Sequence, residues 1–487
     1  MRRTLNPSTV SVLIGIALCF PWSDPSQAGE ECTLVLARGS ATVDGRPLMM
    51  KSRDVSNADQ EFVYEDLGPY AYIGVTYAGV TNQAWGGVNE VGFAICNANA
   101  WNFEDSVSGP DDDGFIQRLA LRTCLTVEDF QAIMDSTDGT GRSRTAIYGV
   151  FDANGDGAYF EAANYEHFRY DLDDPGAAPN GYMVRANFAY SGGSYHLGQH
   201  RHDRALAFLD TAFIENNISY QLLCQTILRD LVNEEVNPYP LPFQGYDGLL
   251  PYGLIHTHDS INRDITRSAY VVQGIIPGED PLLSTVWALA GEPVSTIALP
   301  LWVHALSAPP EFDGPEFSAL NVKAQAFANY FYARQWSYDG LDTWKLINER
   351  GEGFLPFRDS LEVHSFAVGD SALTVWRNLG LPASSEVEDL QNSLAVWALA
   401  EMETWGPPEP PQVTITWQTA DWVQLDWEPV AQDVFGRPIT VSSYTIFGSQ
   451  QPFFNRLPGD SITTVASPPV SFSAPETHRF FQVRCRP

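Results

Sequence analysis

The chain has 487 residues, 44% of them hydrophobic and 12% aromatic, which is the composition of a folded protein of two or three domains and excludes a disordered one. Its formal charge is -32 at pH 7, so a polyanionic partner would be repelled and nucleic-acid binding is excluded as a main function. This excess of acidic residues is typical of a well-solvated surface.

The N-terminus has the pattern of a secretory signal peptide. Arg2 and Arg3 precede an apolar run over residues 10–20, and small and turn-forming residues then lead to Ala28. The run is shorter than the roughly 18 to 20 residues that span a membrane, and no later segment is both long and uncharged enough. We therefore expect residues 1–28 to be removed, and the mature protein to be secreted, periplasmic or held at the cell surface, with no membrane span.

The cysteines of the mature chain are odd in number. Six are present, and Cys19 leaves with the signal peptide, so five remain. In an oxidising compartment an unpaired thiol calls for a functional explanation. Four of the five can pair or be buried as small hydrophobes: Cys96, Cys124, Cys224 and Cys485. Cys32 stands apart because it lies only a few residues after the predicted cleavage site.

Strand-like and helix-like patterns are mixed between residue 32 and residue 405. Runs rich in β-branched and aromatic residues predict strands over residues 33–37, 71–77, 92–97, 146–151, 157–162 and 269–274. Helical periodicity is present over residues 114–124, 127–134, 202–214, 219–232, 315–335 and 385–403. A tight turn over residues 152–157 joins two strands directly, which indicates a hairpin. Hairpins combined with helices predict a layered α+β fold.

The C-terminal part reads as a separate, all-β domain. Residues 406–412 are a proline-rich linker, and short β-rich segments follow over residues 413–418, 422–427, 442–448, 463–466 and 480–484. The run that begins at Val423, together with Tyr444-Thr-Ile-Phe, resembles a fibronectin type III module. That resemblance implies a small immunoglobulin-like β-sandwich over residues 413–487. Such modules serve as spacers or adhesion pieces, so contact with a cell surface or matrix is one expected role.

A hairpin begins at Cys32. The cysteine opens a strand, Asp44-Gly45 makes a turn, and a strand over residues 47–54 returns, which brings Lys51 and Asp54 back alongside the cysteine. This arrangement resembles the start of the Ntn cysteine hydrolases, which include the choloylglycine and penicillin V hydrolases, acyl-CoA:6-aminopenicillanate acyltransferase-like peptidases and related dipeptidases. In those families a new N-terminal cysteine is followed by a DG turn and a G-R-N-x-D-like strand. Here Lys51 stands at the arginine position.

Further segments extend the resemblance in the family's order. Residues 85–99 are similar to its G-x-N-E-x-G-L strand, with Asn99 at the offset of an oxyanion-hole asparagine, and residues 184–187 end on Asn187, where the family has a catalytic-site asparagine. Residues 151–161 resemble its D-x-x-G hairpin. Thr266-Arg267-Ser268 lies upstream of residues 284–293, which are similar to its T-x-W…G-x-P region. Together these segments cover most of residues 32–300.

The resemblance implies an Ntn αββα four-layer sandwich over residues 32–405 and a mature chain that begins at Cys32. Signal peptidase cutting after Ala28 leaves residues 29–31 as a short propeptide, so a second cut at Glu31-Cys32 is expected. A thiol is nucleophilic as its thiolate, and an N-terminal cysteine brings its own base in the α-amine, whose ordinary pKa is about 7.7 to 8.0. The implied reaction is acyl transfer from an amide, through a thioester, to water.

Five further residues are implied as catalytic. Asp54 would hold and orient the α-ammonium, while Lys51 and Arg267 would favour the thiolate electrostatically. The side-chain amides of Asn99 and Asn187 would donate to the oxyanion. Simpler interpretations stand beside these: a disulfide for Cys32, an ion pair for Lys51 and Asp54, and turn positions for the asparagines.

The choice of arginine remains open, and the histidines give no sign of a metal site. Arg263 is a near neighbour of Arg267 and could fill the same role. The histidines match no recognised ligand spacing, so no metal and no cofactor are expected; they are His196, His200, His202, His256 and His258.

The predicted function is hydrolysis of a linear C–N amide bond in a small-molecule substrate. One alternative is an acyltransferase or dipeptidase of the same superfamily. Another, from a different class, is a non-catalytic adhesion or binding protein built on a hydrolase scaffold. The N-terminal residue of the mature protein discriminates between the last alternative and the enzymes.

Overall fold

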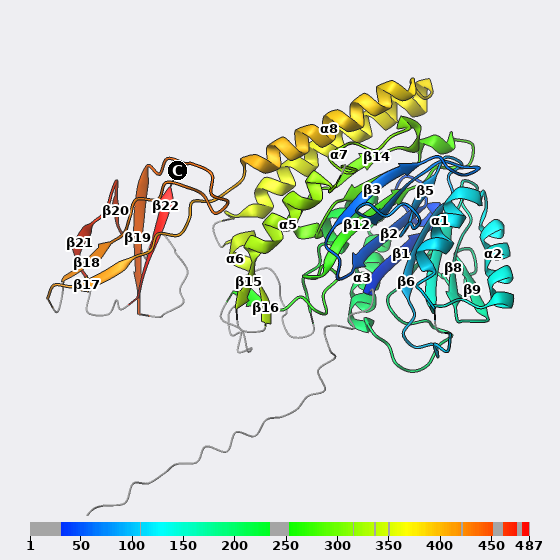
Figure 1. Ribbon diagram of the computed structural model, residues 1–487, viewed down its shortest axis with the longest axis horizontal. Helices are drawn as coiled ribbons and strands as arrows, with labels where there is room; N and C mark the ends of the chain where they lie inside the picture. Colours follow the sequence, from blue (N-terminus) through cyan, green and yellow to red (C-terminus); the bar gives the residue numbers. More distant parts are fainter. Residues whose placement is uncertain are drawn as a thin grey trace, which may run out of the picture.

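The computed structural model describes residues 31–486, apart from residues 108, 234–252, 315, 336–337, 349–350, 420–421, 451–460 and 475–479. It is a mixed α/β structure with several antiparallel sheets (Figure 1). The predicted signal peptide and the first two residues of the predicted propeptide lie outside the described residues.

The first sheet carries Cys32. Its strands, in spatial order, are β10 (Tyr182–Arg185), β1 (Glu31–Ala37), β2 (Leu48–Asp54), β12 (Thr266–Gln273), β13 (Thr285–Leu289) and β14 (Leu299–Leu301). β1 and β2 form the predicted hairpin, and Gly45 in its turn has a φ of +78°, a conformation that glycine adopts without strain. The register places Glu31 opposite Asp54 and Cys32 opposite Arg53.

The second sheet is a meander whose strands follow chain order. They are β3 (Gln60–Glu65), β4 (Tyr72–Tyr77), β5 (Gly87–Asn89), β6 (Ala94–Asn99), β7 (Ala146–Phe151), β8 (Gly157–Ala162) and β9 (His167–Asp171). Alternate side chains of the strands face opposite ways, so Leu34 and Leu36 pack with Ile73 and Ala94 of this sheet, while Val35 belongs to a different core cluster.

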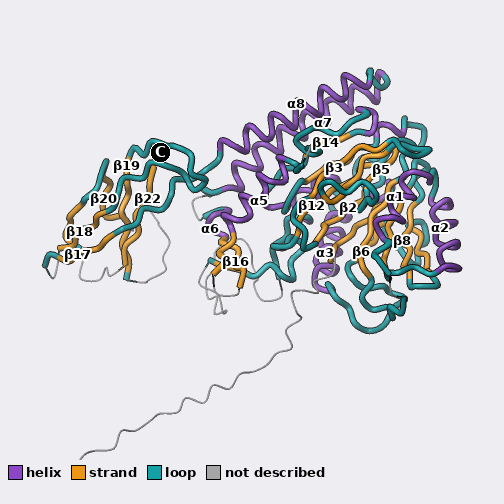
Figure 2. The backbone as a smooth tube through the Cα atoms, in the orientation of Figure 1, coloured by secondary structure: helices purple, strands orange, loops and turns teal. Residues whose placement is uncertain are grey.

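Helices cover the outer faces of both sheets (Figures 1 and 2). α1 (Asp113–Thr123) and α2 (Val127–Thr140) share a core cluster with the second sheet. α3 (Gln199–Ile214), α7 (Phe354–Leu379) and the start of α8 (Ser384–Thr404) share one with the first sheet. α5 (Ala319–Phe331) adds Leu320 and Phe327 to the cluster between the sheets.

The middle of the chain differs from expectation. The predicted helix over residues 219–232 is only a short turn, α4 (Tyr220–Leu222), followed by a π-helical turn over Leu223–Ile227. The predicted helix over residues 315–335 ends at Phe331, because the chain continues into β15 (Tyr332–Gln335). β15 pairs with β16 (Tyr338–Asp342), which pairs with β11 (Leu254–Ile255) and precedes α6 (Thr343–Leu346).

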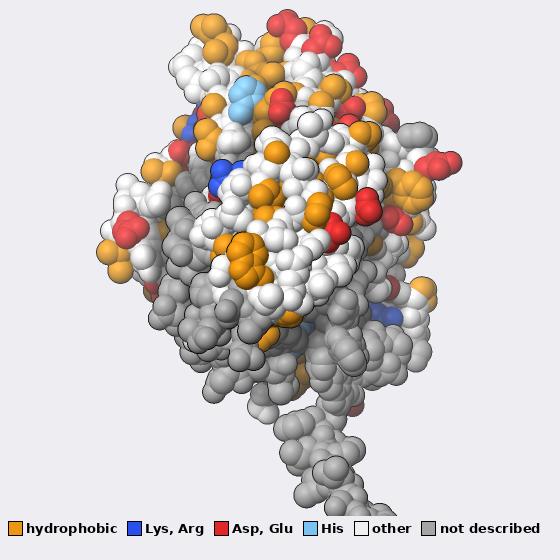
Figure 3. Space-filling view, turned by 90° about the vertical axis from the view of Figure 1, so that its left-hand side faces the viewer, with side chains coloured by type: hydrophobic (Ala, Val, Ile, Leu, Met, Phe, Trp, Pro, Cys, Tyr) orange, Lys and Arg blue, Asp and Glu red, His pale blue; other side chains and the backbone are white. Residues whose placement is uncertain are grey.

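The C-terminal region contains two small antiparallel sheets. One consists of β17 (Thr414–Trp417), β18 (Trp422–Asp426) and β21 (Val470–Ser473), and the other of β20 (Ser461–Val465), β19 (Ser443–Ser449) and β22 (Phe480–Arg486). A core of its own includes Leu425 and Ile446. Hydrophobic side chains are scattered over the face of this end of the molecule (Figure 3). Among the described residues, no helix is long and apolar enough to cross a membrane.

Candidate active site

Cys32 is the second residue of β1 and is almost fully buried. Its side chain belongs to the core cluster between the two sheets. Its peptide N–H donates to Oδ1 of Asn187, just beyond β10, at 2.9 Å, and its carbonyl accepts from Nη1 of Arg201, in the first turn of α3, also at 2.9 Å. Side chains from two other elements therefore fix both backbone polar groups of the cysteine.

Asp54 lies at the end of β2, diagonally across from Cys32, and is completely buried. The Thr266 hydroxyl donates to its Oδ1 at 2.6 Å, and Nη1 of Arg263 and Nη1 of Arg201 lie 3.5 and 3.8 Å from its Oδ2. Burial raises the pKa of Asp54, and the two guanidinium groups and the Thr266 hydrogen bond act in the opposite direction. A carboxylate in this setting is oriented by its partners and is suited to hold a cation.

The residue before the cysteine is bound by the same two arginines. The carboxylate of Glu31 accepts from Nη2 of Arg201 at 3.0 Å and from Nη1 of Arg263 in a still closer contact. Arg201 also donates to Oδ1 of Asn187 at 3.0 Å. The Glu31–Cys32 peptide group therefore lies inside one connected polar cluster.

Lys51 is fully buried and anchored in a polar chain between the sheets and α1. Its Nζ donates to the carbonyl of Trp85 at 3.0 Å and to Oδ1 of Asn97 at 2.5 Å. Asn97 in turn donates to Asp113, which also accepts from the Tyr148 hydroxyl. A lysine that is satisfied in this way supplies a fixed positive charge on the face of the sheet to which the Cys32 side chain belongs.

Arg53 is a second buried cation, and sequence reasoning missed it. It stands directly opposite Cys32 on β2, so the two side chains share one face of the sheet. Its Nη1 donates to Oε1 of Gln60 at 2.7 Å, and its guanidinium lies over the rings of Tyr77 and Trp85 at 4.4 and 4.7 Å. The hairpin register, which the DG turn implies, is the signal that could have identified it.

The two predicted oxyanion asparagines meet, but their amides are used differently. Nδ2 of Asn187 donates to the backbone carbonyl of Asn99 at 3.1 Å, while its Oδ1 accepts from Cys32 and Arg201. Asn187 thus positions the backbone of Cys32. Asn99, at the end of β6, is buried, and its Oδ1 makes no hydrogen bond within the described residues.

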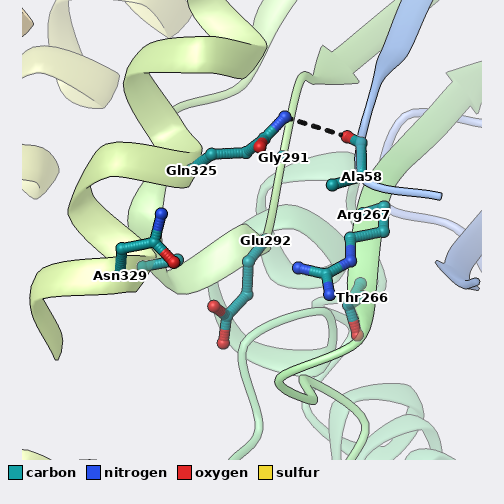
Figure 4. A pocket seen from close by; sticks show the side chains of 8 residues that line it. Ala58, Thr266, Arg267, Gly291, Glu292, Gln325 and Asn329 are labelled. Atoms are coloured by element: carbon teal, nitrogen blue, oxygen red, sulfur yellow. Dashed lines mark hydrogen bonds between the residues drawn. The ribbon is translucent and has the colours of Figure 1, made fainter. Parts of the chain in front are cut away.

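Arg267 lies apart from the cysteine. It lies at a bulge in β12, and because of this bulge Ser268, not Arg267, stands opposite Arg53. It lines a cavity of about 190 Å³ together with Glu292 of the loop after β13 (Figure 4). Arg263 contacts Asp54 instead and occupies the position that the sequence analysis had left open between the two arginines.

The other cysteines lack an activating environment. None of the five described cysteines is in a disulfide. Burial raises the pKa of Cys96 to about 12, of Cys124 to about 12 and of Cys485 to about 11, and burial also raises that of Cys224. Thiols with such values stay protonated at neutral pH and are poor nucleophiles.

Two acidic clusters among the described residues have the composition of a metal site, one at residues 111–113 and one that includes His167. Asp135, Asp138 and His167 bring ligand-type atoms within 4.8 Å of one another. The His167 ring is hydrogen-bonded to Asp138 at 2.8 Å, and Arg142 pairs with the same aspartate at 2.5 Å. These partners satisfy the cluster without an ion.

Comparison with known proteins gives structural neighbours only. No protein-family model and no curated protein matches the chain. The structure is similar to penicillin V acylase from Agrobacterium tumefaciens, with a TM-score of 0.34 and 14% identity, over 56% of this chain and 86% of that one. It is also similar to a mutant of conjugated bile acid hydrolase from Clostridium perfringens, with a TM-score of 0.33 and 11% identity, over 53% of this chain and 89% of that one. A likeness at this level carries no information about reaction or substrate.

Proposed function

We propose that this protein is an exported Ntn amidohydrolase whose mature N-terminus is Cys32 and which cleaves a linear C–N amide bond. Two stacked sheets with helices outside them support an αββα four-layer sandwich as its catalytic domain. We assign residues 1–28 to a signal peptide, residues 29–31 to a propeptide, residues 406–412 to a linker and residues 413–487 to an immunoglobulin-like sandwich.

The observation that carries the proposal is the way the Glu31–Cys32 peptide group is held. Asn187 accepts from the very N–H that becomes the α-amine after cleavage, and buried Asp54 lies across the strand pair from Glu31. An ordinary structural cysteine needs none of these partners. A nucleophile whose own amine is its base needs all of them.

Maturation follows from this geometry. The Cys32 thiol attacks the carbonyl carbon of Glu31, a C–S bond forms, the peptide C–N bond breaks and the freed nitrogen takes up a proton as the α-amine. Water then hydrolyses the thioester and releases the propeptide. The same atoms act in each later turnover, with the substrate amide in place of the Glu31 peptide bond.

Each neighbour has a role in turnover. The α-amine takes the proton of the thiol, Asp54 orients the resulting ammonium, and that ammonium later protonates the leaving amine. Arg53 and Lys51 stabilise the thiolate by their fixed charge. Asn99 is the oxyanion donor, and one such donor contributes about 3 to 4 kcal/mol in enzymes where it has been removed.

Intact-mass measurement tests the proposal. Wild-type protein should begin at Cys32, whereas Cys32→Ala should keep residues 29–31 and hydrolyse no amide in a panel of penicillin V, conjugated bile acids, N-acyl amino acids and dipeptides. Cys96→Ala is the matched control, since it removes a buried thiol of raised pKa and should be processed normally. Active wild-type protein that retains residues 29–31 would contradict the mechanism. Product analysis with an added amine separates hydrolysis from acyl transfer.

A further inference from the structure

Arg201 and Arg263 form a buried binding site for a carboxylate, and Glu31 occupies it. Both guanidinium groups donate to Oε2 of Glu31, Arg201 at 3.0 Å and Arg263 in closer contact. The arginine side chains are only 1% and 9% exposed, whereas that of Glu31 is 18% exposed. Two buried cations that converge on one oxygen form a built anion site, unlike an exposed ion pair.

Cleavage before Cys32 upsets the charge balance of this cluster. In the intact chain the carboxylates of Glu31 and Asp54 face the two guanidinium groups of Arg201 and Arg263. Removal of Glu31 leaves Asp54 as the carboxylate that both guanidinium groups face, with Asp264 acting on Arg263 alone, and the new α-amine at Cys32 adds a further group that can carry positive charge. Buried charge without a counter-charge is unfavourable, so the vacated position favours an anion.

We propose that the cleaved enzyme uses Arg201 and Arg263 to bind a carboxylate on the acyl group of its substrate, where the Glu31 carboxylate lies before cleavage. This inference rests on the proposed function, because only cleavage vacates the site.

The chemistry of Glu31 specifies the class of acyl group. Its carbonyl carbon is the atom that the Cys32 thiol attacks during maturation, so Glu31 stands on the acyl side of the bond that breaks. Its Cα, Cβ and Cγ separate that carbonyl from the bound carboxylate. A glutaryl group has the same spacing, so N-glutaryl and α-glutamyl amides are the substrates that fit both the thiol and the arginine pair.

Two anilides of equal length test the site. N-Glutaryl-4-nitroanilide and N-pentanoyl-4-nitroanilide differ only in a terminal carboxylate against a methyl group. Wild type should prefer the glutaryl compound at least about tenfold in kcat/KM, since a charge-assisted hydrogen bond contributes about that factor or more. Arg263→Gln should remove most of this preference. Arg204→Gln is the control, because Arg204 lies on α3 three residues after Arg201 but pairs with Asp230.

The outcomes separate the inference from the function on which it rests. A wild-type enzyme that cleaves both anilides equally well overturns the anion site and leaves the amidohydrolase in place. Arg263→Gln that slows both anilides by the same factor also overturns it, since Arg263 would then only position Asp54. Absence of processing and of amide hydrolysis would instead refute the proposed function.

Calorimetric titration with glutarate adds a measurement that needs no turnover. Processed wild type should bind glutarate and not its uncharged diamide. Cys32→Ala, in which Glu31 still fills the site, should bind neither. Equal glutarate affinity in the two proteins, or no binding to the processed one, overturns the inference.

Discussion

At the scale of single residues, Cys32 shares one face of the sheet with two buried cations, Arg53 and Lys51, which differ in position and in hydrogen-bond partners. Arg53 is the direct cross-strand neighbour, and Cβ atoms of such pairs are about 5 Å apart. Lys51 lies two cross-strand pairs further along, opposite Leu34, and its ammonium is bound to Asn97 and to the Trp85 carbonyl. Because Coulomb attraction falls with distance, Arg53 should contribute more to thiolate stability.

Arg53→Met should therefore raise the apparent pKa of the Cys32 thiol more than Lys51→Met does, and Lys51→Arg should be partly tolerated because it keeps the charge. The pH dependence of iodoacetamide alkylation in processed protein, followed at Cys32 by mass spectrometry, measures both shifts. Unchanged profiles in the two Met variants would show that neither cation acts on the thiol.

The raised pKa of buried Glu292 predicts that the free energy of unfolding depends on pH. Burial raises its pKa to about 8, against the opposing hydrogen bonds from Tyr332 and Asn262, whereas in the unfolded chain it should titrate near its ordinary 4.5. Between these values the folded state holds the extra proton, so its contribution to stability is full below about pH 4.5 and falls by up to about 1.4 kcal/mol per pH unit as pH rises to 8.

Glu292→Gln should remove this part of the slope. Urea unfolding at pH 5, 6.5 and 8 would measure it, with the variant losing less free energy of unfolding across the range than wild type. Equal slopes would place the titration of Glu292 outside this window.

At the scale of elements, two glycines in helices differ in how much room their surroundings leave for a methyl group. α7 crosses the first sheet at Gly369, where an added Cβ would lie 2.7 Å from Cη2 of Trp287, a ring of β13. Gly139, near the end of α2, has nothing within 4 Å of the same position. Gly369 therefore allows α7 to pack closely on Trp287, whereas Gly139 is not required for packing.

Gly369→Ala should lower the free energy of unfolding by about 1 to 3 kcal/mol, because a packed core has no room for the methyl group. Gly139→Ala should raise it, by at most about 1 kcal/mol, through helix propensity alone. Thermal unfolding of the two variants is a direct comparison, and a stabilised Gly369→Ala would mean that α7 is not closely packed there.

At the scale of the whole molecule, the C-terminal region contacts the helical part through an aromatic cluster and through an ion pair between Arg484 and Glu352, whose charged atoms lie 2.7 Å apart. The ring of Phe435 lies 5.6 Å from that of Phe327 in α5 and 6.2 Å from that of Trp405. Arg437 also donates to the Trp405 carbonyl at 2.5 Å. The proline-rich segment therefore does not isolate the C-terminal region, although none of the residues described there contacts Glu31, Cys32 or Asp54.

A chain that ends at Trp405 should keep its kcat/KM and lose thermal stability, because Phe327 of α5 loses its contact with the ring of Phe435. Phe435→Ala in the full-length chain should lower the melting temperature in the same direction with activity unchanged. Loss of activity in a truncated protein that still unfolds cooperatively would show that the C-terminal region takes part in turnover.

Local patterns in the sequence were sufficient to predict the elements that carry Cys32. Asp44-Gly45 and the alternation on either side of it predict the hairpin, which the structure has as β1 and β2 with Asp54 at its end. The helix expected over residues 385–403 is α8. Turn chemistry and hydrophobic period depend on neighbouring residues, so a single sequence contains them.

The partners of Cys32 were decided only by the tertiary structure. Arg201 reaches the carbonyl of Cys32 across a sequence separation of 169 residues, because α3 packs on the first sheet. The bulge at Thr266 turns Arg267 away and leaves Arg263 beside Asp54. Contacts between residues so far apart in the sequence depend on how sheets and helices stack, and a local sequence pattern does not predict this stacking. The sequence by itself therefore predicted that Cys32 and Asp54 lie together on one hairpin, while packing selected the arginines that surround them.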